Sequence, residues 1–164
     1  MTKIIAILNH KGGVGKTTTT INLAAAFQQK KKRVMVIDLD GQANLTESFG
    51  YSIEEEKTVY GAMKCEYPLP IIETGSGISL VPSCLDLSAA ESELINEPGR
   101  EMILRGLIAK VPEVNKYDYI LIDCSPSLGL ITVNALTASD SVLIPVQCEY
   151  FALEGIGKLL NTIK

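Results

Sequence analysis

Residues 10–18 read His-Lys-Gly-Gly-Val-Gly-Lys-Thr-Thr, a set of residue types suited to binding the phosphates of a nucleoside triphosphate. Glycine lets the backbone curl so that several N–H groups point at one anion, and three glycines stand here, Gly12, Gly13 and Gly15. We expect the ammonium group of Lys16 to reach the β- and γ-phosphates and the Thr17 hydroxyl to bind Mg²⁺. The segment therefore predicts a site for a triphosphate and magnesium.

The segments on either side of this loop match a strand and a helix, the order found in a P-loop. A helix that starts near Lys16 would add the positive end of its dipole to the phosphate site. His10 stands where the standard motif has glycine, and Lys11 is an additional lysine. The alternative, a flexible glycine turn with incidental lysines, does not account for the flanking pattern. The predicted nucleotide-binding residues are Lys11, Gly12, Gly13, Val14, Gly15, Lys16, Thr17 and Thr18.

Acidic residues follow two other strand-like runs. Asp38 and Asp40 are two residues apart, so on an extended segment both carboxylates would point to one side, toward the phosphates. A carboxylate there can orient an attacking water or hold Mg²⁺ through its waters, and the alternative is a solvated Asp-Gly turn. Asp123 ends an apolar run, as in the Walker B arrangement, where the acid serves the magnesium shell. We expect the Gln147 carboxamide to bind a base or a partner, or to pack at the sheet edge.

Apolar runs alternate with helical patterns along the chain, which predicts an α/β fold with an open, mostly parallel sheet and helices on both faces. We treat residues 1–164 as one domain. The expected strands are residues 4–9, 34–38, 78–81, 119–123 and 142–146. The expected helices are residues 18–30, about 58–65, about 88–95, 100–111, 128–138 and 153–163. In such sheets ligands bind beyond the carboxyl ends of the strands, which is where the loop and the acids fall.

Composition favours a soluble, cytoplasmic protein. The 164 residues include 46% apolar and 21% charged side chains, with no apolar run long enough for a membrane span and no signal-peptide pattern. The net charge of −4 argues against a strongly basic surface, and the run Lys30-Lys31-Lys32-Arg33 either complements a helix end or contacts DNA. The cysteines lack metal-site spacing, and we expect Cys124 and Cys148 to be buried thiols.

Taken together, the motifs resemble the deviant Walker A ATPases, and within them the ParA/Soj partition ATPases. The resemblance rests on Lys-Gly-Gly-Val-Gly-Lys-Thr-Thr, on Asp38-Leu39-Asp40-Gly41-Gln42-Ala43-Asn44, and on Asp123-Cys124-Ser125-Pro126-Ser127-Leu128-Gly129. A further match runs from Pro145 to Gly155. These segments occur in order over essentially the whole chain. Ser125 departs from the family pattern, which commonly has proline there.

The resemblance implies a Mg²⁺-dependent ATPase that dimerises with ATP. In this family Lys11 would reach the partner's nucleotide, Lys16 and Thr17 would bind phosphate and Mg²⁺, and Asp40 would support hydrolysis. Asp123 would be the Walker B acid, so the predicted catalytic residues are Lys11, Lys16 and Asp40, and the predicted metal site is Thr17, Asp40 and Asp123. The family further implies non-specific DNA binding in the ATP state, release by a ParB-like protein, and a place on the nucleoid. The chain stops where family members continue, so we expect a C-terminally shortened form.

Three other functions remain as alternatives. A MinD-like ATPase that positions itself on a membrane surface would need a C-terminal amphipathic helix. A carrier of metal clusters would need paired cysteines at an interface. A non-catalytic fragment would serve only as an interaction domain.

Overall fold

Three strands with nearly continuous apolar sequence form the centre of the sheet. The computed structural model describes residues 2–52 and 57–148. All six residues of β2 (Val34–Leu39) are buried, and so are five of the six in β5 (Tyr119–Cys124). β1 (Lys3–Ile7) lies on the other side of β5. Such sequences suit strands that are covered on both faces, as in parallel sheets.

The sheet has six strands in the order β3-β4-β2-β5-β1-β6. Every neighbouring pair is parallel except β3 with β4, which is antiparallel. The prediction of an open, mostly parallel α/β sheet is therefore confirmed. The remaining strands are β3 (Ile72–Glu73), β4 (Ser79–Val81) and β6 (Ser141–Leu143).

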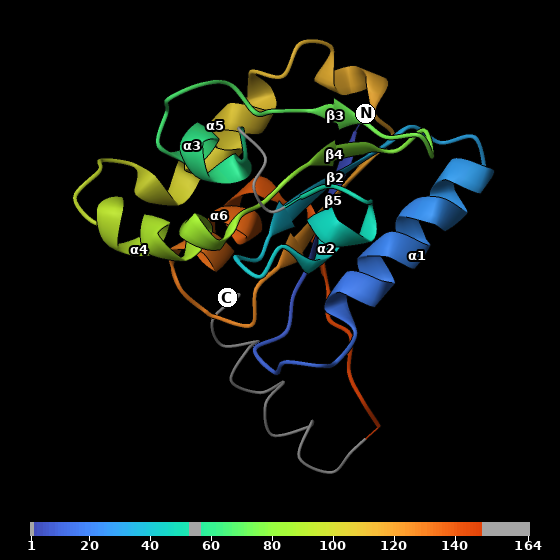
Figure 1. Ribbon diagram of the computed structural model, residues 1–164, viewed down its shortest axis with the longest axis horizontal. Coiled ribbons are helices and arrows are strands. Elements are labelled where there is room, and N and C mark those ends of the chain that lie inside the picture. The colour runs from blue at the N-terminus through green and yellow to red at the C-terminus, as the bar shows by residue number, and fades with distance from the viewer. Residues whose placement is uncertain (1, 53–56, 149–164) are drawn as a thin grey trace.

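Helices cover both faces of this sheet (Figure 1). One face carries α1 (Lys16–Gln29) and α2 (Asn44–Ser48), which pack on alternate strand residues such as Ile7, Val36 and Leu121. The other face carries the helices and turns that follow α2 in the chain. They are α3 (Val59–Met63), η1 (Leu85–Ala89), α4 (Ala90–Glu93), η2 (Arg100–Met102), α5 (Ile103–Ala109), η3 (Val114–Lys116) and α6 (Leu130–Ala138).

Strand register brings the functional segments to one edge. Val34 of β2 and Lys3 of β1 both pair with Tyr119 at the start of β5, so these three strands begin and end at nearly the same level. Asp38 then pairs with Asp123 near the carboxyl ends of β2 and β5. The loop after β1 leaves the sheet at this same edge, as expected for a site in an open α/β sheet.

Several short elements differ from the predictions. The helix expected over residues 88–95 is a 3₁₀ turn, η1, followed by the single helical turn of α4, and the one expected over 100–111 is divided into η2 and α5. β3, α2 and η3 were not predicted, because two to five residues carry too little periodicity to indicate an element. The last expected strand stops at Leu143, two residues before Pro145. The helix expected over residues 153–163 lies outside the described residues.

Candidate nucleotide site

The loop between β1 and α1 has the backbone shape that its glycines predict. Gly13 has φ +73° and Gly15 has φ +89°, both in the left-handed region that disfavours side chains. A Cβ at either position would meet no atom within 4 Å, so the conformation, and not crowding, requires glycine. The Thr19 N–H then donates to the Gly15 carbonyl at 2.8 Å and starts α1. The loop therefore leads directly into a helix N-terminus.

Two amide side chains hold this loop in place. Asn9 accepts a hydrogen bond from the Lys11 N–H at 3.1 Å and donates to the Pro145 carbonyl at 2.8 Å. Gln147, which follows β6, donates to the Gly13 carbonyl at 3.3 Å. The carboxamide expected to bind a base or a partner, or to pack at the sheet edge, thus holds the phosphate loop in this structure. Nothing in the sequence around Gln147 indicates this contact, since it joins residues 134 positions apart.

The two lysines of the loop lie in different environments. Lys16 is only 7% exposed, and its ammonium group donates to the Lys11 carbonyl across the loop at 3.3 Å. This places a cation against the converging backbone. Lys11 is exposed at the rim, where its ammonium group donates to Gln147 at 3.3 Å. Lys16 is thus an internal cation of the loop, whereas Lys11 is on the surface.

Asp123 is a buried acid beside the start of α1. Its side chain is 1% exposed, and one carboxylate oxygen accepts from the Thr20 hydroxyl at 3.3 Å. The other oxygen has no hydrogen-bond partner among the described residues. Burial raises the pKa of Asp123 to about 7, opposed by the Thr17 and Thr20 hydroxyls and supported by repulsion from Asp38.

These surroundings fit a divalent cation. A buried carboxylate oxygen without a partner gains from a cation nearby, and the Thr17 hydroxyl acts on the same carboxyl group. Among the described residues no group of three or more His, Cys, Asp or Glu side chains is arranged to hold a metal by itself. A magnesium ion here would therefore depend on phosphate and water ligands, which is how Mg²⁺ is usually bound beside a nucleotide.

Asp38 lies in a different environment from half-buried Asp40, the other acid that was predicted to point toward the phosphates. It is fully buried under α2, where one oxygen accepts from the Thr46 N–H at 2.9 Å and from its hydroxyl at 2.7 Å. The other oxygen accepts from the Asp40 N–H at 3.1 Å. Burial raises the pKa of Asp38 to about 6 despite these hydrogen bonds. Asp38 therefore shapes the segment that carries Asp40.

Asp40 lies just beyond the end of β2 and is half-buried. One of its oxygens accepts from the Gln42 N–H at 3.0 Å, which closes a tight turn at Gly41. A Cβ at Gly41 would lie 2.4 Å from the Ser88 hydroxyl oxygen, so η1 packs directly on this turn. The charge of Asp40 acts on Asp123, which means that the acids after β2 and β5 share one electrostatic site.

The structure thus brings most of the predicted residues to one edge of the sheet. The site described above contains Lys16, Thr17, Asp40 and Asp123. Val14 is half-buried in the same loop, and Thr18 is exposed in the first turn of α1. Among the cysteines, Cys124 is buried as expected, but Cys148 is exposed because the chain has left β6 before it.

The fold and this site define a P-loop domain. Residues 2–164 match the family model of the AAA domain. The chain belongs to this family of P-loop proteins, as its sequence motifs predict.

Two curated proteins are similar in sequence to this chain. The sporulation initiation inhibitor protein Soj of Bacillus subtilis is 48% identical over 168 residues, which cover 100% of this chain and 66% of Soj. The chromosome partitioning protein ParA of Myxococcus xanthus is 46% identical over 165 residues, which cover 98% of this chain and 58% of ParA. The chain therefore spans less than two thirds of the length of these relatives.

A solved structure supports the assignment of the fold. Cobyrinic acid a,c-diamide synthase from Mycobacterium smegmatis, with bound ADP and magnesium, is similar with a TM-score of 0.94 and 38% sequence identity. The match covers 99% of this chain and 67% of that one. In the described part of our chain, no helix has the length and hydropathy needed to span a membrane.

Proposed function

We propose that this chain is the nucleotide-binding part of an ATPase that partitions plasmids or chromosomes. The observation that carries the proposal is the glycine loop with Lys16 turned inward, beside the buried and partly unpartnered carboxylate of Asp123. This pairing provides what phosphoryl transfer needs, namely a phosphate cradle and an acid for the magnesium shell. The likeness to Soj and ParA supports the biological role.

In the proposed reaction, water attacks the γ-phosphate of ATP, and ADP and phosphate leave. Lys16 and the loop N–H groups hold the β- and γ-phosphates and stabilise the charge that builds up during transfer. Thr17 and Asp123 would hold Mg²⁺, which supplies further charge stabilisation between the phosphates. Asp40 orients the attacking water from the turn after β2, where one of its oxygens accepts from the Gln42 N–H and the other accepts no hydrogen bond from the described residues.

Lys11 has a separate role in this proposal. It is exposed at the rim of the loop and is not needed for the cradle, since Lys16 and the start of α1 already supply positive charge. In the ATP state its ammonium group leaves Gln147 and binds the nucleotide of a second copy, so that two chains close face to face over two nucleotides. Dimerisation would then depend on ATP.

The dimer binds DNA without sequence specificity, and a ParB-like protein stimulates hydrolysis and releases it. The protein would then act in the cytoplasm, on the nucleoid. The net charge of −4 means that the composition of this chain does not by itself provide a strongly basic DNA-binding surface. A MinD-like role on a membrane surface is the competing proposal. Co-sedimentation with DNA and with liposomes, each in the presence of ATP, distinguishes the two.

Replacing Asp40 by alanine tests the enzymatic part of the proposal. We expect ATP affinity to stay within about threefold of wild type and single-turnover hydrolysis to fall about 100-fold, because the lost group acts on the transition state. Asp86→Ala is the matched control, since Asp86 is an exposed acid on η1. Unchanged hydrolysis in Asp40→Ala would contradict the assigned role. Hydrolysis that is absent from wild type as well would contradict the ATPase function itself.

A further inference from the structure

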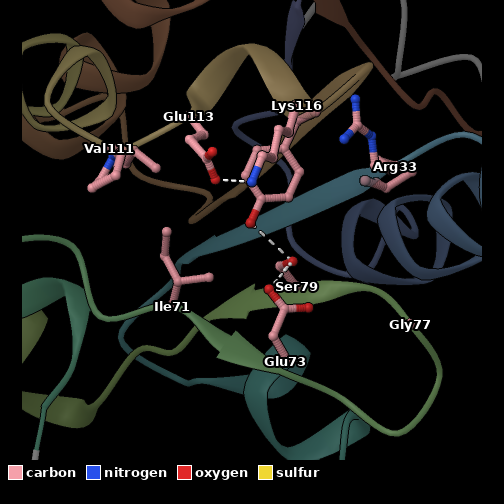
Figure 2. A pocket seen from close by; sticks show the side chains of 11 residues that line it. Arg33, Ile71, Glu73, Gly77, Ser79, Val111, Glu113 and Lys116 are labelled. Carbon is pink, nitrogen blue, oxygen red and sulfur yellow. Dashed lines mark hydrogen bonds and ion pairs between the residues drawn. The ribbon is translucent and has the colours of Figure 1, made fainter.

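A hollow lies where the central strands begin, whereas the phosphate loop lies where they end. Figure 2 shows the residues that line this hollow. Its volume is about 560 Å³, within the range of small-molecule sites. It opens where β2, β4 and β5 begin, between the β3–β4 hairpin and the segment that follows α5. α1 starts at the phosphate loop and ends four residues before Arg33, which lines the hollow. The nucleotide site and the hollow therefore lie at opposite ends of α1.

A chain of hydrogen bonds forms the polar floor of the hollow. The Tyr117 hydroxyl donates to the Ser79 hydroxyl oxygen at 3.0 Å, and Ser79 donates to a carboxylate oxygen of Glu73 at 2.9 Å. Ser79 is only 3% exposed. Both hydroxyl protons are therefore donated within this chain of hydrogen bonds, which holds the three side chains in place. The oxygens of Tyr117 and Glu73 that face the hollow can act only as hydrogen-bond acceptors.

The walls differ from one another in chemistry. Figure 2 shows Ile71 and Val111 on one side of the hollow and Arg33 on the other. Val111 is buried, Ile71 is half-buried, and both belong to the apolar core under α5. A ligand that fills the hollow would therefore meet an apolar wall at one end and a cation at the other.

Arg33 is the cation available to such a ligand. In residues 2–52 and 57–148, its guanidinium group makes no hydrogen bond and no ion pair within 4 Å. The neighbouring cations form ion pairs, Lys32 with Asp118 at 3.7 Å and Lys116 with Glu113. The charge of Arg33 also acts on Asp118, but from beyond ion-pair distance. Arg33 closes the run Lys30-Lys31-Lys32-Arg33, and the other charged residues that line the hollow are Glu73, Glu113 and Lys116.

We propose that this hollow binds a small organic anion with an apolar body. The anionic group, a carboxylate or a phosphate, pairs with the Arg33 guanidinium, whose planar donors suit both. The apolar body lies against Ile71, Val111 and the Tyr117 ring. The site is separate from the nucleotide site, and its occupation does not depend on the function proposed above.

Amide shifts in NMR spectra of the nucleotide-free protein test the proposal with four probes. 3-Phenylpropionate has both features, 3-phenylpropan-1-ol lacks the charge, and acetate and inorganic phosphate lack the apolar body. We expect 3-phenylpropionate to shift the Gly77 and Ser79 amides with a dissociation constant on the order of millimolar. We expect the other three probes to bind at least about tenfold more weakly. Equal binding of all anions, or no shift at these amides, would overturn the proposal.

Two substitutions test the two ends of the site separately. Arg33→Gln should weaken 3-phenylpropionate binding about tenfold or more, whereas Lys30→Gln, in the same basic run but outside the hollow, should leave it unchanged. Ile71→Ala should weaken binding several-fold through lost apolar contact. The amide spectrum itself reports whether each variant is folded. Equal loss in Arg33→Gln and Lys30→Gln would mean that only the general positive potential attracts the anion, and would overturn the site.

Discussion

Replacement of Asp123 by asparagine should stabilise the nucleotide-free protein at pH 8 much more than at pH 5. The Asp123 side chain is 1% exposed, and one of its oxygens has no partner among the described residues. Burial raises its pKa to about 7 from the ordinary 3.8. The folded protein thus holds this proton more tightly than the unfolded chain, and the free energy of unfolding falls as pH rises between these values.

The magnitude follows from that pKa difference. At pH 8, where Asp123 is charged in both states, its burial costs the folded state about 4 kcal/mol. At pH 5, where folding requires Asp123 to take up a proton, the cost is about 2 kcal/mol. Asparagine removes the charge at both pH values but leaves an amide N–H buried, a penalty of about 1–3 kcal/mol that does not change with pH. The advantage of the variant should therefore shrink by about 2–3 kcal/mol between pH 8 and pH 5.

Urea unfolding at the two pH values, with a chelator present and without nucleotide, measures this difference. Asp86→Asn on exposed η1 is the control, and its free energy of unfolding should follow wild type at both pH values. A difference between Asp123→Asn and wild type that is the same at pH 5 and pH 8 would refute the reasoning. The result would mean that Asp123 is not a buried, charged group in the free protein.

Two other substitutions have equally direct outcomes. Thr46→Val removes the hydroxyl that donates to Asp38 at 2.7 Å, and urea unfolding should show that the free energy of unfolding falls by about 2–3 kcal/mol. The control Ser48→Ala, at an exposed position of the same helix, should lower it by less than about 0.5 kcal/mol. Equal losses in the two variants would refute the buried contact. Lys11→Ala should leave monomer stability unchanged but reduce the dimer seen by light scattering with a non-hydrolysable ATP analogue. Equal dimer fractions in wild type, Lys11→Ala and the control Lys30→Ala would exclude the role proposed for Lys11.

The central strands were predictable because their signal is local and strong. β1, β2 and β5 are apolar nearly throughout, and each alternates with a helical pattern, so the order of elements and the parallel sheet follow from the sequence. The elements that were missed or misjudged are short. β3 has two residues, and η1 joins α4 where one helix was expected. Ser88 of η1 lies against the Gly41 turn, a contact between distant residues that the local sequence pattern does not indicate.

The phosphate loop was predictable for a similar reason, since glycine spacing acts within one turn. The contacts that brace it were not, because Gln147 reaches Gly13 only once β6 lies beside β1. The burial of Asp38 was missed because it depends on α2, whose five residues fold back so that Thr46 covers the carboxylate. Alternation along an extended segment gives the direction of a side chain but not what covers it.

Isothermal titration of ATP with Mg²⁺ into wild type and Lys16→Ala is the most direct test of the central claim, that this loop is a nucleotide site. Lys16 is the buried cation of the loop, and its loss removes hydrogen bonds to charged oxygens worth about 1.5–3 kcal/mol each. We predict binding by wild type and by the control Lys30→Ala, and no measurable binding by Lys16→Ala. Unchanged ATP affinity in Lys16→Ala would contradict the account.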